Sequence, residues 1–296
     1  MQICSQLFRN FKVEDKISIG NLELFPIKVD LRLTPENVRS LPELMEAGSV
    51  IITEIDESGN VEKARVTNSS EFYLFIMDGE ALIGAKQNRI AQKSVIIPPN
   101  CSINLPVNCV ERSRWSSGMQ GSFKRGDFAL PPSAREKKGK LLKSKMNMLI
   151  QESVWDSVDD IAAKKETFSP TADLGEILAS SRDIADDISN ANISEIDCNG
   201  FVVFGAGRPF IEIFYDETVC KLHQPTSQKA WLADASETSD QSKTKQDATT
   251  LLEQLSQSFW STEDPVGYET AFSSEEHNNG RIVLKDDAFI HGYFYA

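Results

Sequence analysis

Two polar blocks carry the side chains of this sequence that are best suited to chemistry. The first block, Lys86–Arg89, is a run of four hydrogen-bonding side chains between apolar Leu82-Ile83 and Val95–Ile97, and Glu80 precedes it. The second block consists of Glu111, Arg112, Arg114 and Trp115. In a strand or a tight turn, alternate side chains face opposite sides, so one pair of the first block is expected to face a cavity and the other water.

These residue types suit the binding of a phosphorylated sugar or nucleotide. A carboxylate can accept a hydrogen bond from a ribose hydroxyl or act as a general base. An arginine can donate two parallel hydrogen bonds to a phosphate, and an indole can stack on a nucleobase. We therefore predict Glu80 and Glu111 as catalytic carboxylates. The predicted ligand-binding residues are Lys86, Gln87, Asn88, Arg89, Arg112, Arg114 and Trp115. The alternative interpretation is ordinary polarity at the edge of a sheet.

Two glycine-rich stretches match known nucleotide loops only in part. In Gly79–Gln87 the second glycine is followed by Ala85, where a triphosphate-binding loop needs a lysine. In Gly205–Phe210 a phenylalanine stands at the third glycine position of the dinucleotide fingerprint. Neither stretch predicts a phosphate loop, and the second one is better interpreted as a hairpin turn.

Positive charge is concentrated in one segment of an acidic chain. The sequence has 31 Lys and Arg against 44 Asp and Glu, a formal net charge of −13. Residues 112–145 hold ten basic and two acidic residues, a local charge of +8 that leaves −21 for the rest. Such an island favours a small anionic ligand, with a solvated lysine-rich helix face as the alternative. The acidic remainder argues against a protein that coats nucleic acid, but an RNA end docked on residues 112–145 stays open.

The cysteines and histidines predict no metal site, and the cofactor is unknown. Five cysteines include no Cys-x-x-Cys pair, and the three histidines are late and well separated. Cys109 lies in the second block, but a nucleophilic role needs a nearby base that lowers its pKa. No apolar run approaches the roughly 18 residues of a membrane span. Charged residues also occupy the place where a secretory signal needs its apolar core, so we expect a cytoplasmic protein without a membrane partner.

Secondary-structure signals run from strands to helices and back to strands. The turn Ser58-Gly59-Asn60 between β-branched runs predicts a hairpin over 50–66, and Thr34-Pro35 predicts a helix over 34–45. Apolar spacing predicts helices within 133–188, with Pro170 between two of them. This order predicts an α+β fold: a largely antiparallel, sandwich-like sheet core in the N-terminal half, a helical middle segment and returning C-terminal strands.

The predicted organisation is one body with an N-terminal extension and a polar loop. The segments are an extension over 1–19, a main domain over 20–235, a flexible loop over 236–248, and a helix with strands over 249–296 that pack on the same body. Within the main domain we expect strands over 20–116, helices over 130–190, and a hairpin with a helix over 193–235.

Several sequence blocks together carry a family resemblance. The most specific are Gly84–Arg89 (Gly-Ala-Lys-Gln-Asn-Arg) and Cys109–Trp115 (Cys-Val-Glu-Arg-Ser-Arg-Trp), and further blocks run on through Gln151–Trp155 and Phe214–Asp216. They resemble the ARG and rhodanese-phosphatase-superfamily-associated protein domain family over most of residues 20–235. That family's name records association with ADP-ribosylglycohydrolases and rhodanese-phosphatase proteins. The resemblance therefore implies a role in handling ADP-ribose or NAD-derived nucleotides.

The leading hypothesis is a protein that binds an ADP-ribose-like or NAD-derived nucleotide as its small anionic partner. If it is an enzyme, a hydrolase or transferase acting at phosphate or ribose is expected. One alternative is a non-enzymatic sensor or interaction module of a nucleotide-signalling or stress-defence system, with a homo-oligomer or protein partner. A less favoured alternative is an RNA-processing accessory protein. It predicts RNA binding that weakens steeply as the salt concentration rises.

Overall fold

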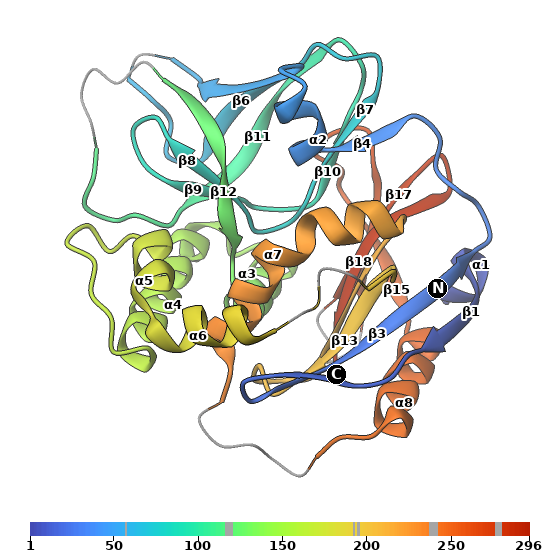
Figure 1. The fold of residues 1–296 in the computed structure, drawn as a ribbon. Coiled ribbons are helices and arrows are strands. Elements are labelled where there is room, and N and C mark those ends of the chain that lie inside the picture. The colour runs from blue at the N-terminus through green and yellow to red at the C-terminus, as the bar shows by residue number, and fades with distance from the viewer. Residues whose placement is uncertain (57, 116–120, 192, 194–195, 237–241, 276–279) are drawn as a thin grey trace. The chain divides into compact units, whose positions relative to one another are not determined.

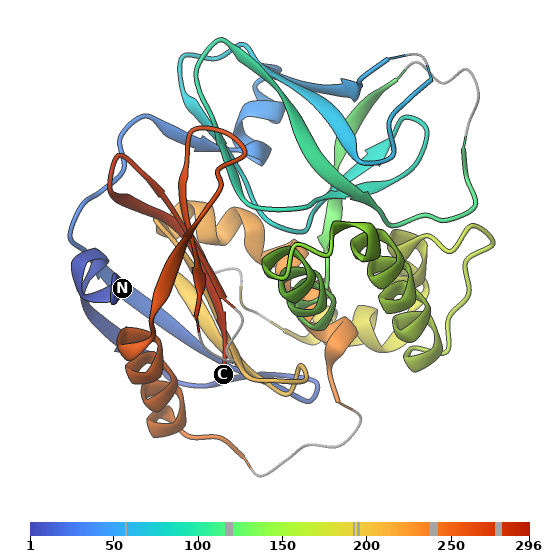
Figure 2. The ribbon, with the colours of Figure 1, turned by 180° about the vertical axis from the view of Figure 1, so that it is seen from behind.

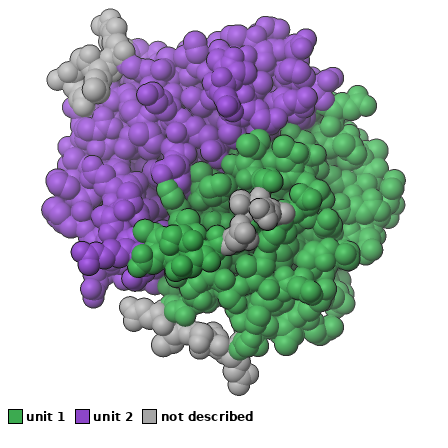
Figure 3. All heavy atoms as spheres, in the orientation of Figure 1, with its two compact units in different colours: residues 1–36, 185–265, 270–296 green, residues 37–184, 266–269 purple. Residues whose placement is uncertain are grey.

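The fold divides into two units, each built from segments that lie far apart in the sequence (Figures 1 and 3). The structure is a computed structural model that describes every residue except 57, 116–120, 192, 194–195, 237–241 and 276–279. Unit 1 comprises residues 1–36, 185–265 and 270–296, and unit 2 comprises residues 37–184 and 266–269. Helices make up 31% and strands 36%, and the sheets are mostly antiparallel, so the α+β prediction is confirmed.

Unit 2 is built around a closed six-stranded barrel. Its strands, in barrel order, are β11 (Cys101–Cys109), β6 (Lys63–Asn68), β5 (Val50–Glu54), β12 (Ser122–Ala129), β8 (Glu80–Gly84) and β9 (Arg89–Ala91). Strands β5 and β6 pair antiparallel with Val50 opposite Asn68, which confirms the predicted hairpin. Apolar side chains such as Ile52, Leu82 and Phe123 are fully or almost fully buried in the core of this unit. Closure gives each barrel strand two partners.

A second, three-stranded sheet in unit 2 contains β10 (Val95–Ile97), β7 (Tyr73–Ile76) and β4 (Val38–Ser40), and β4 pairs with β7 in parallel. The helix predicted over 34–45 is wrong at its start, because α2 spans Leu41–Glu46. Ser40 and Glu43 form a capping box there, in which the Ser40 N–H donates to Glu43 Oε2 at 2.8 Å. This cap fixes the helix start after β4 and outweighs the weaker signal at Thr34-Pro35.

The middle of the chain is helical, as predicted. The elements are α3 (Pro132–Lys143), the short 3-10 helix η1 (Asn147–Leu149), α4 (Ile150–Lys164), α5 (Leu174–Ser180) and α6 (Arg182–Asn190). Pro170 lies between α4 and α5, where the sequence predicts a break. Both views show α3 and α4 as neighbouring helices of unit 2 (Figures 1 and 2).

Unit 1 contains a nine-stranded sheet among its described residues. Its strands are β1 (Phe8–Val13), β2 (Ile17–Ile19), β3 (Leu22–Leu31), β13 (Gly200–Phe204), β14 (Phe210–Phe214), β15 (Trp260–Glu263), β16 (Thr270–Ser274), β17 (Gly280–Lys285) and β18 (Ala288–Tyr295). The order is β1-β3-β13-β14-β18-β17-β16-β15, and β2 also pairs with β3. The predicted hairpin of β13 and β14 and the closing strands are confirmed. Residues of the predicted extension 1–19 form β1 and β2, strands of this sheet.

Helices cover both faces of the unit 1 sheet. Trp231 of α7 (Glu217–Asp234) packs on Phe201, with ring centroids 5.3 Å apart. Phe204, on the opposite face of the same strand, shares a core cluster with Leu252 of α8 (Lys245–Gln257). Burial on both faces explains why Phe201–Phe204 is an uninterrupted apolar run.

The polar loop predicted over 236–248 is too long at its C-terminal end. Helix α8 already begins at Lys245, because Thr244 and Asp247 form a capping box: the Thr244 N–H donates to Asp247 Oδ2 at 2.7 Å. Residues 237–241 of the predicted loop lie outside the described residues. The four-residue helix α1 (Cys4–Leu7) precedes β1 in the same unit.

Candidate functional site

The two polar blocks meet at one end of the unit 2 barrel. Residues 85–88 form the turn between β8 and β9, and residues 110–115 follow the end of β11. Strands β9 and β11 are neighbours, with Arg89 opposite Cys109. The end of one strand and the start of the next therefore bring the blocks together, although more than twenty residues separate them.

Asn88 is the centre of a hydrogen-bond network at this barrel end. Its backbone N–H donates to Glu111 Oε2 at 3.0 Å. Its side-chain oxygen accepts from the Gly84 N–H at 2.9 Å and from Arg114 Nη2 at 3.1 Å. Its side-chain amide donates to Asp173 Oδ2 at 2.6 Å. One asparagine thus links both polar blocks to the start of α5.

Arg114 is held in place by the same network and is still 28% exposed. Its Nε donates to Glu111 Oε1 at 2.7 Å, and Nη1 donates to the Ala85 carbonyl at 3.1 Å. The hydrogen bond to Glu111 raises the pKa of Arg114 above its ordinary value. The result is a positive charge of fixed orientation near the protein surface.

Trp115 contacts Lys86 and remains partly exposed to solvent. The Lys86 ammonium lies 5.5 Å from the centre of the indole, within the range of a cation–π contact. Lys86 itself is buried, whereas Trp115 is 43% exposed. Gly59 closes over this pair with a φ of 77°, and a Cβ there would lie 2.7 Å from Lys86 Cδ and 3.1 Å from Trp115 Cζ2. Lys86 and Gly59 therefore hold an indole that is partly exposed to solvent.

Arg112 is the second partly exposed cation of the site. Its guanidinium forms an ion pair with Asp159 at 2.9 Å and lies 5.3 Å from the centre of the Trp155 ring. The carbonyl of Arg112 accepts a hydrogen bond from Gln87 Nε2 at 3.3 Å, and its N–H donates to Thr171. Helix α4 therefore positions the Arg112 side chain, and Gln87 is buried beneath it.

Arg89 and Glu80 lie in the interior and are engaged there. Arg89 Nη2 contacts both oxygens of Glu54 at 2.9 and 2.8 Å, and its Nη1 donates to the carbonyls of Asn60 and Lys63. Glu80 Oε1 accepts from Arg125 Nε at 2.7 Å. Both residues are completely buried. The geometry therefore gives both a supporting role in the barrel, and their predicted ligand-binding and catalytic roles remain predictions.

Asp173 belongs to the site but does not stand out in the sequence. It caps α5 by accepting the Glu176 N–H at 2.8 Å, and it lies at a backbone bridge with Glu111. Burial raises the pKa of Asp173 above its ordinary value, and the nearby charge of Glu111 adds to that effect. The Asp-x-x-Glu spacing signals the cap, but nothing local signals the contact with Asn88.

We expect the effect of Asp173→Asn on stability to depend on pH. A carboxyl whose pKa is raised in the folded state binds protons more tightly there, so its contribution to stability falls as the pH rises above the ordinary value of 3.8. Asparagine lacks this titration. Urea unfolding from pH 4 to 7 should show the free energy of unfolding of the variant rising relative to wild type. If the difference in free energy of unfolding between variant and wild type did not depend on pH, the folded and unfolded states would bind the Asp173 proton equally well.

Gln151 of α4 holds the end of β11 in the manner of a strand partner. Its Oε1 accepts the Cys109 N–H at 2.9 Å, and its Nε2 donates to the Cys109 carbonyl at 2.8 Å. Burial raises the pKa of the Cys109 thiol to about 11, so the thiol stays protonated at neutral pH. The lowered pKa that a nucleophilic cysteine needs is not found at Cys109.

Among the residues that the structure describes, no group of three or more His, Cys, Asp or Glu side chains is arranged to hold a metal ion. Within the same described part of the chain, no helix is both long and apolar enough to cross a membrane.

The fold and the site define an α+β protein whose barrel end carries a fixed network of carboxylates, arginines and an exposed indole. The chain belongs to the ARG and Rhodanese-Phosphatase-superfamily-associated Protein domain family, whose model matches residues 10–295. This match confirms the resemblance and extends it beyond residues 20–235. No curated protein and no solved structure shows a significant match to the chain. The family's name associates it with ARG and with the rhodanese-phosphatase superfamily.

Proposed function

We propose that the protein binds an anionic nucleotide derivative of the ADP-ribose class at the exposed side of this barrel end. The observation that carries the proposal is the segment Glu111–Trp115, which presents two oriented, partly exposed arginines and an exposed indole within five residues. The association recorded in the family's name agrees with a ligand of this class.

Each group of the segment has a defined task in this proposal. The open face of Trp115 stacks on the base, since base–aromatic stacking tolerates any base and is worth about 1–3 kcal/mol. Arg112 and Arg114 contact the phosphates, for which the planar guanidinium is suited. Asp159 and Glu111 hold these guanidiniums in place, so little side-chain freedom is lost when the ligand binds.

The arrangement supports binding more strongly than turnover. Glu111 accepts from both Asn88 and Arg114, and Glu80 accepts from Arg125 deep in the barrel. A general base needs a carboxylate within reach of the proton that it removes, and both carboxylates are buried. We therefore infer a sensor or carrier of the nucleotide, with the two glutamates as supports of the binding groups.

The test is isothermal titration of the purified protein with ADP-ribose, AMP and inorganic phosphate. We expect ADP-ribose to bind more tightly than the other two, because it alone offers a base and a diphosphate together. Trp115→Ala is expected to weaken ADP-ribose binding by about tenfold or more, as the stacking energy implies. Arg112→Ala is expected to weaken binding of ADP-ribose and of phosphate alike.

Arg65→Ala is the matched control, since Arg65 is an exposed arginine on barrel strand β6. Its affinity should match that of wild type. Equal affinities of wild type and Trp115→Ala for ADP-ribose, or no binding at millimolar ligand, would refute the proposed site. Recovery of the ligand unchanged after long incubation with stoichiometric protein supports the sensor over the enzyme.

Catalysis is a second candidate, favoured by the raised pKa of Asp173 beside Glu111. A carboxyl group that keeps its proton to a higher pH than usual suits the general acid of a reaction at a ribose linkage. Conversion of ADP-ribose by wild type, and its loss in Asp173→Asn with binding retained, would establish this alternative.

A further inference from the structure

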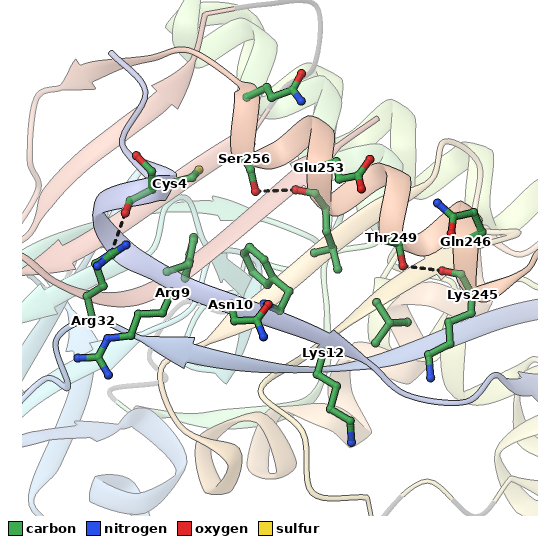
Figure 4. Close-up of a pocket in the computed structure, with 16 residues that line it drawn as sticks. Cys4, Arg9, Asn10, Lys12, Arg32, Lys245, Gln246, Thr249, Glu253 and Ser256 are labelled. Atoms are coloured by element: carbon green, nitrogen blue, oxygen red, sulfur yellow. Dashed lines mark hydrogen bonds between the residues drawn. The ribbon is translucent and has the colours of Figure 1, made fainter.

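A groove in unit 1 lies apart from the residues discussed so far. It runs between the edge strand β1 and helix α8 and has a volume of about 900 Å³ (Figure 4). Both ribbon views draw α8 beside β1 (Figures 1 and 2). The apolar side chains of Phe8, Val13 and Leu252 line it, and Figure 4 shows Arg9, Asn10 and Lys12 along β1 opposite Thr249, Glu253 and Ser256 of α8. The groove is therefore bounded by one open strand edge and one helix face.

We propose that this groove binds an acidic peptide segment of a partner protein, which adds to the sheet as a further strand alongside β1. The proposal is independent of nucleotide binding by unit 2. It rests on the direction of the backbone groups of β1, on the charge of the groove rim and on the apolar lining.

The backbone of β1 offers hydrogen-bonding groups to such a strand. Among the described strands β1 pairs with β3 alone, in a register that places Lys12 opposite Lys28 and Asn10 opposite Asp30. The Glu14 N–H donates to the Pro26 carbonyl, so residues at even positions direct their backbone groups toward β3. Phe11 and Val13 therefore direct theirs to the open edge. The Phe11 N–H is occupied there by the side chain of its own neighbour Asn10, at 2.9 Å, a contact that a partner carbonyl can replace.

Cations outnumber carboxylates among the residues that line the groove, although the protein is acidic. Arg9, Lys12, Arg32 and Lys245 line the groove, against one carboxylate, Glu253. Three of these cations form ion pairs with acidic residues outside the lining: Arg9 with exposed Asp30 at 3.6 Å, Lys12 with half-buried Glu14 at 2.7 Å and Lys245 with exposed Asp15 at 3.5 Å. Ion pairs near the surface contribute little to stability, so the carboxylates of a ligand can compete for these cations at small cost. The excess of cations in the lining, in a chain of net charge −13, favours an acidic partner at this place.

Charge also argues against a second copy of this chain as the occupant. Pairing of β1 with β1 of another molecule would bring Arg9 and Lys12 close to the same residues of the partner. Like charges across adjacent strands are destabilising. A peptide that alternates acidic and apolar side chains instead directs carboxylates to the rim cations and apolar groups to the lining, as strand addition requires.

The test uses a fluorescein-labelled decapeptide of alternating Glu and Val, with fluorescence polarisation on the full-length protein. We expect saturable binding that weakens when the salt concentration is raised. The same peptide with Lys in place of Glu, and the Glu peptide N-methylated at its central backbone amides, should each bind at least tenfold more weakly. The first change tests the charge, and the second tests the strand hydrogen bonds.

The protein variant is Arg9→Glu/Lys12→Glu, with Lys221→Glu, an exposed lysine of α7, as the matched control. We expect the double variant to bind the Glu peptide at least tenfold more weakly and the control to bind within twofold of wild type, both with unchanged circular dichroism. Equal binding of the N-methylated peptide would overturn strand addition and leave an anion site only. Equal binding of the Lys peptide, no binding of the Glu peptide, or a dimer that the double variant dissociates would each overturn the proposal.

Discussion

Replacing Arg89 with methionine is expected to lower the free energy of unfolding by about 3–5 kcal/mol, the usual cost of removing one partner of a buried ion pair. The substitution keeps most of the side-chain volume but leaves the Glu54 carboxylate without its two hydrogen bonds from Nη2. The carbonyls of Asn60 and Lys63 lose their donor as well. Guanidinium chloride unfolding followed by far-ultraviolet circular dichroism measures the change.

Two further variants separate the ion pair from other effects. Arg65→Met removes an exposed arginine from the neighbouring part of the barrel and should change stability by at most about 0.5 kcal/mol. Glu54→Leu/Arg89→Met removes both charges and should be more stable than Arg89→Met alone, because no unpaired charge remains buried. An Arg89→Met variant as stable as wild type would contradict a supporting role and return Arg89 to the list of ligand-binding candidates.

The expected instability also determines which variants can test the proposed nucleotide site. An Arg89 variant that loses binding would report a damaged barrel as readily as a lost phosphate contact. Arg112 and Trp115 are partly exposed, so we expect their truncation to alanine to leave the barrel intact. Affinity changes at these two positions can therefore be attributed to the site.

Local signals in the sequence predicted much of the fold. The turn at Ser58-Gly59-Asn60 lies between β5 and β6, and the apolar spacing within 133–188 corresponds to real helices. What the sequence could not give is pairing between distant segments. Closure of the barrel and the parallel pair of β4 with β7 depend on contacts across many residues. Strands β1 and β2 were missed because their polar and charged residues resemble an extension, as is common for a sheet edge.

The candidate site shows the same division between local and distant information. The types and spacing of the polar residues singled out two blocks, and the structure brings these blocks together at one end of the barrel. They could not distinguish Arg89 from Arg114, because buried Arg89 pairs with Glu54, a mostly buried residue that lies 35 positions away in the sequence. The role of Asp173 could not be predicted either, because its partner Asn88 lies 85 residues away in the sequence.

The second large effect on stability is expected at Lys138, a member of the basic segment 112–145 whose charge is buried in the protein. Lys138 of α3 is completely buried, and its ammonium donates to Asp78 Oδ1 at 2.5 Å and to the Gln92 carbonyl. Lys138→Met is expected to lower the free energy of unfolding by about 3–5 kcal/mol, since Asp78 then loses its closest cation. Urea or guanidinium chloride unfolding at pH 7 measures the change.

The preceding residue in the chain is the control. Lys137 is 51% exposed and pairs with Asp160 at 3.0 Å on the surface, so Lys137→Met should cost no more than about 1 kcal/mol. If the two adjacent variants were equally stable, the buried pair would contribute nothing beyond a surface pair. A large difference would mean that the buried pair of Lys138 with Asp78 stabilises unit 2. The pair of Arg125 with Glu80 is a second example of a basic residue of this segment with a buried partner. The positive charge that the segment offers to a ligand is then carried by its exposed members, Arg112 and Arg114 among them, and is smaller than the sequence total of +8 suggests.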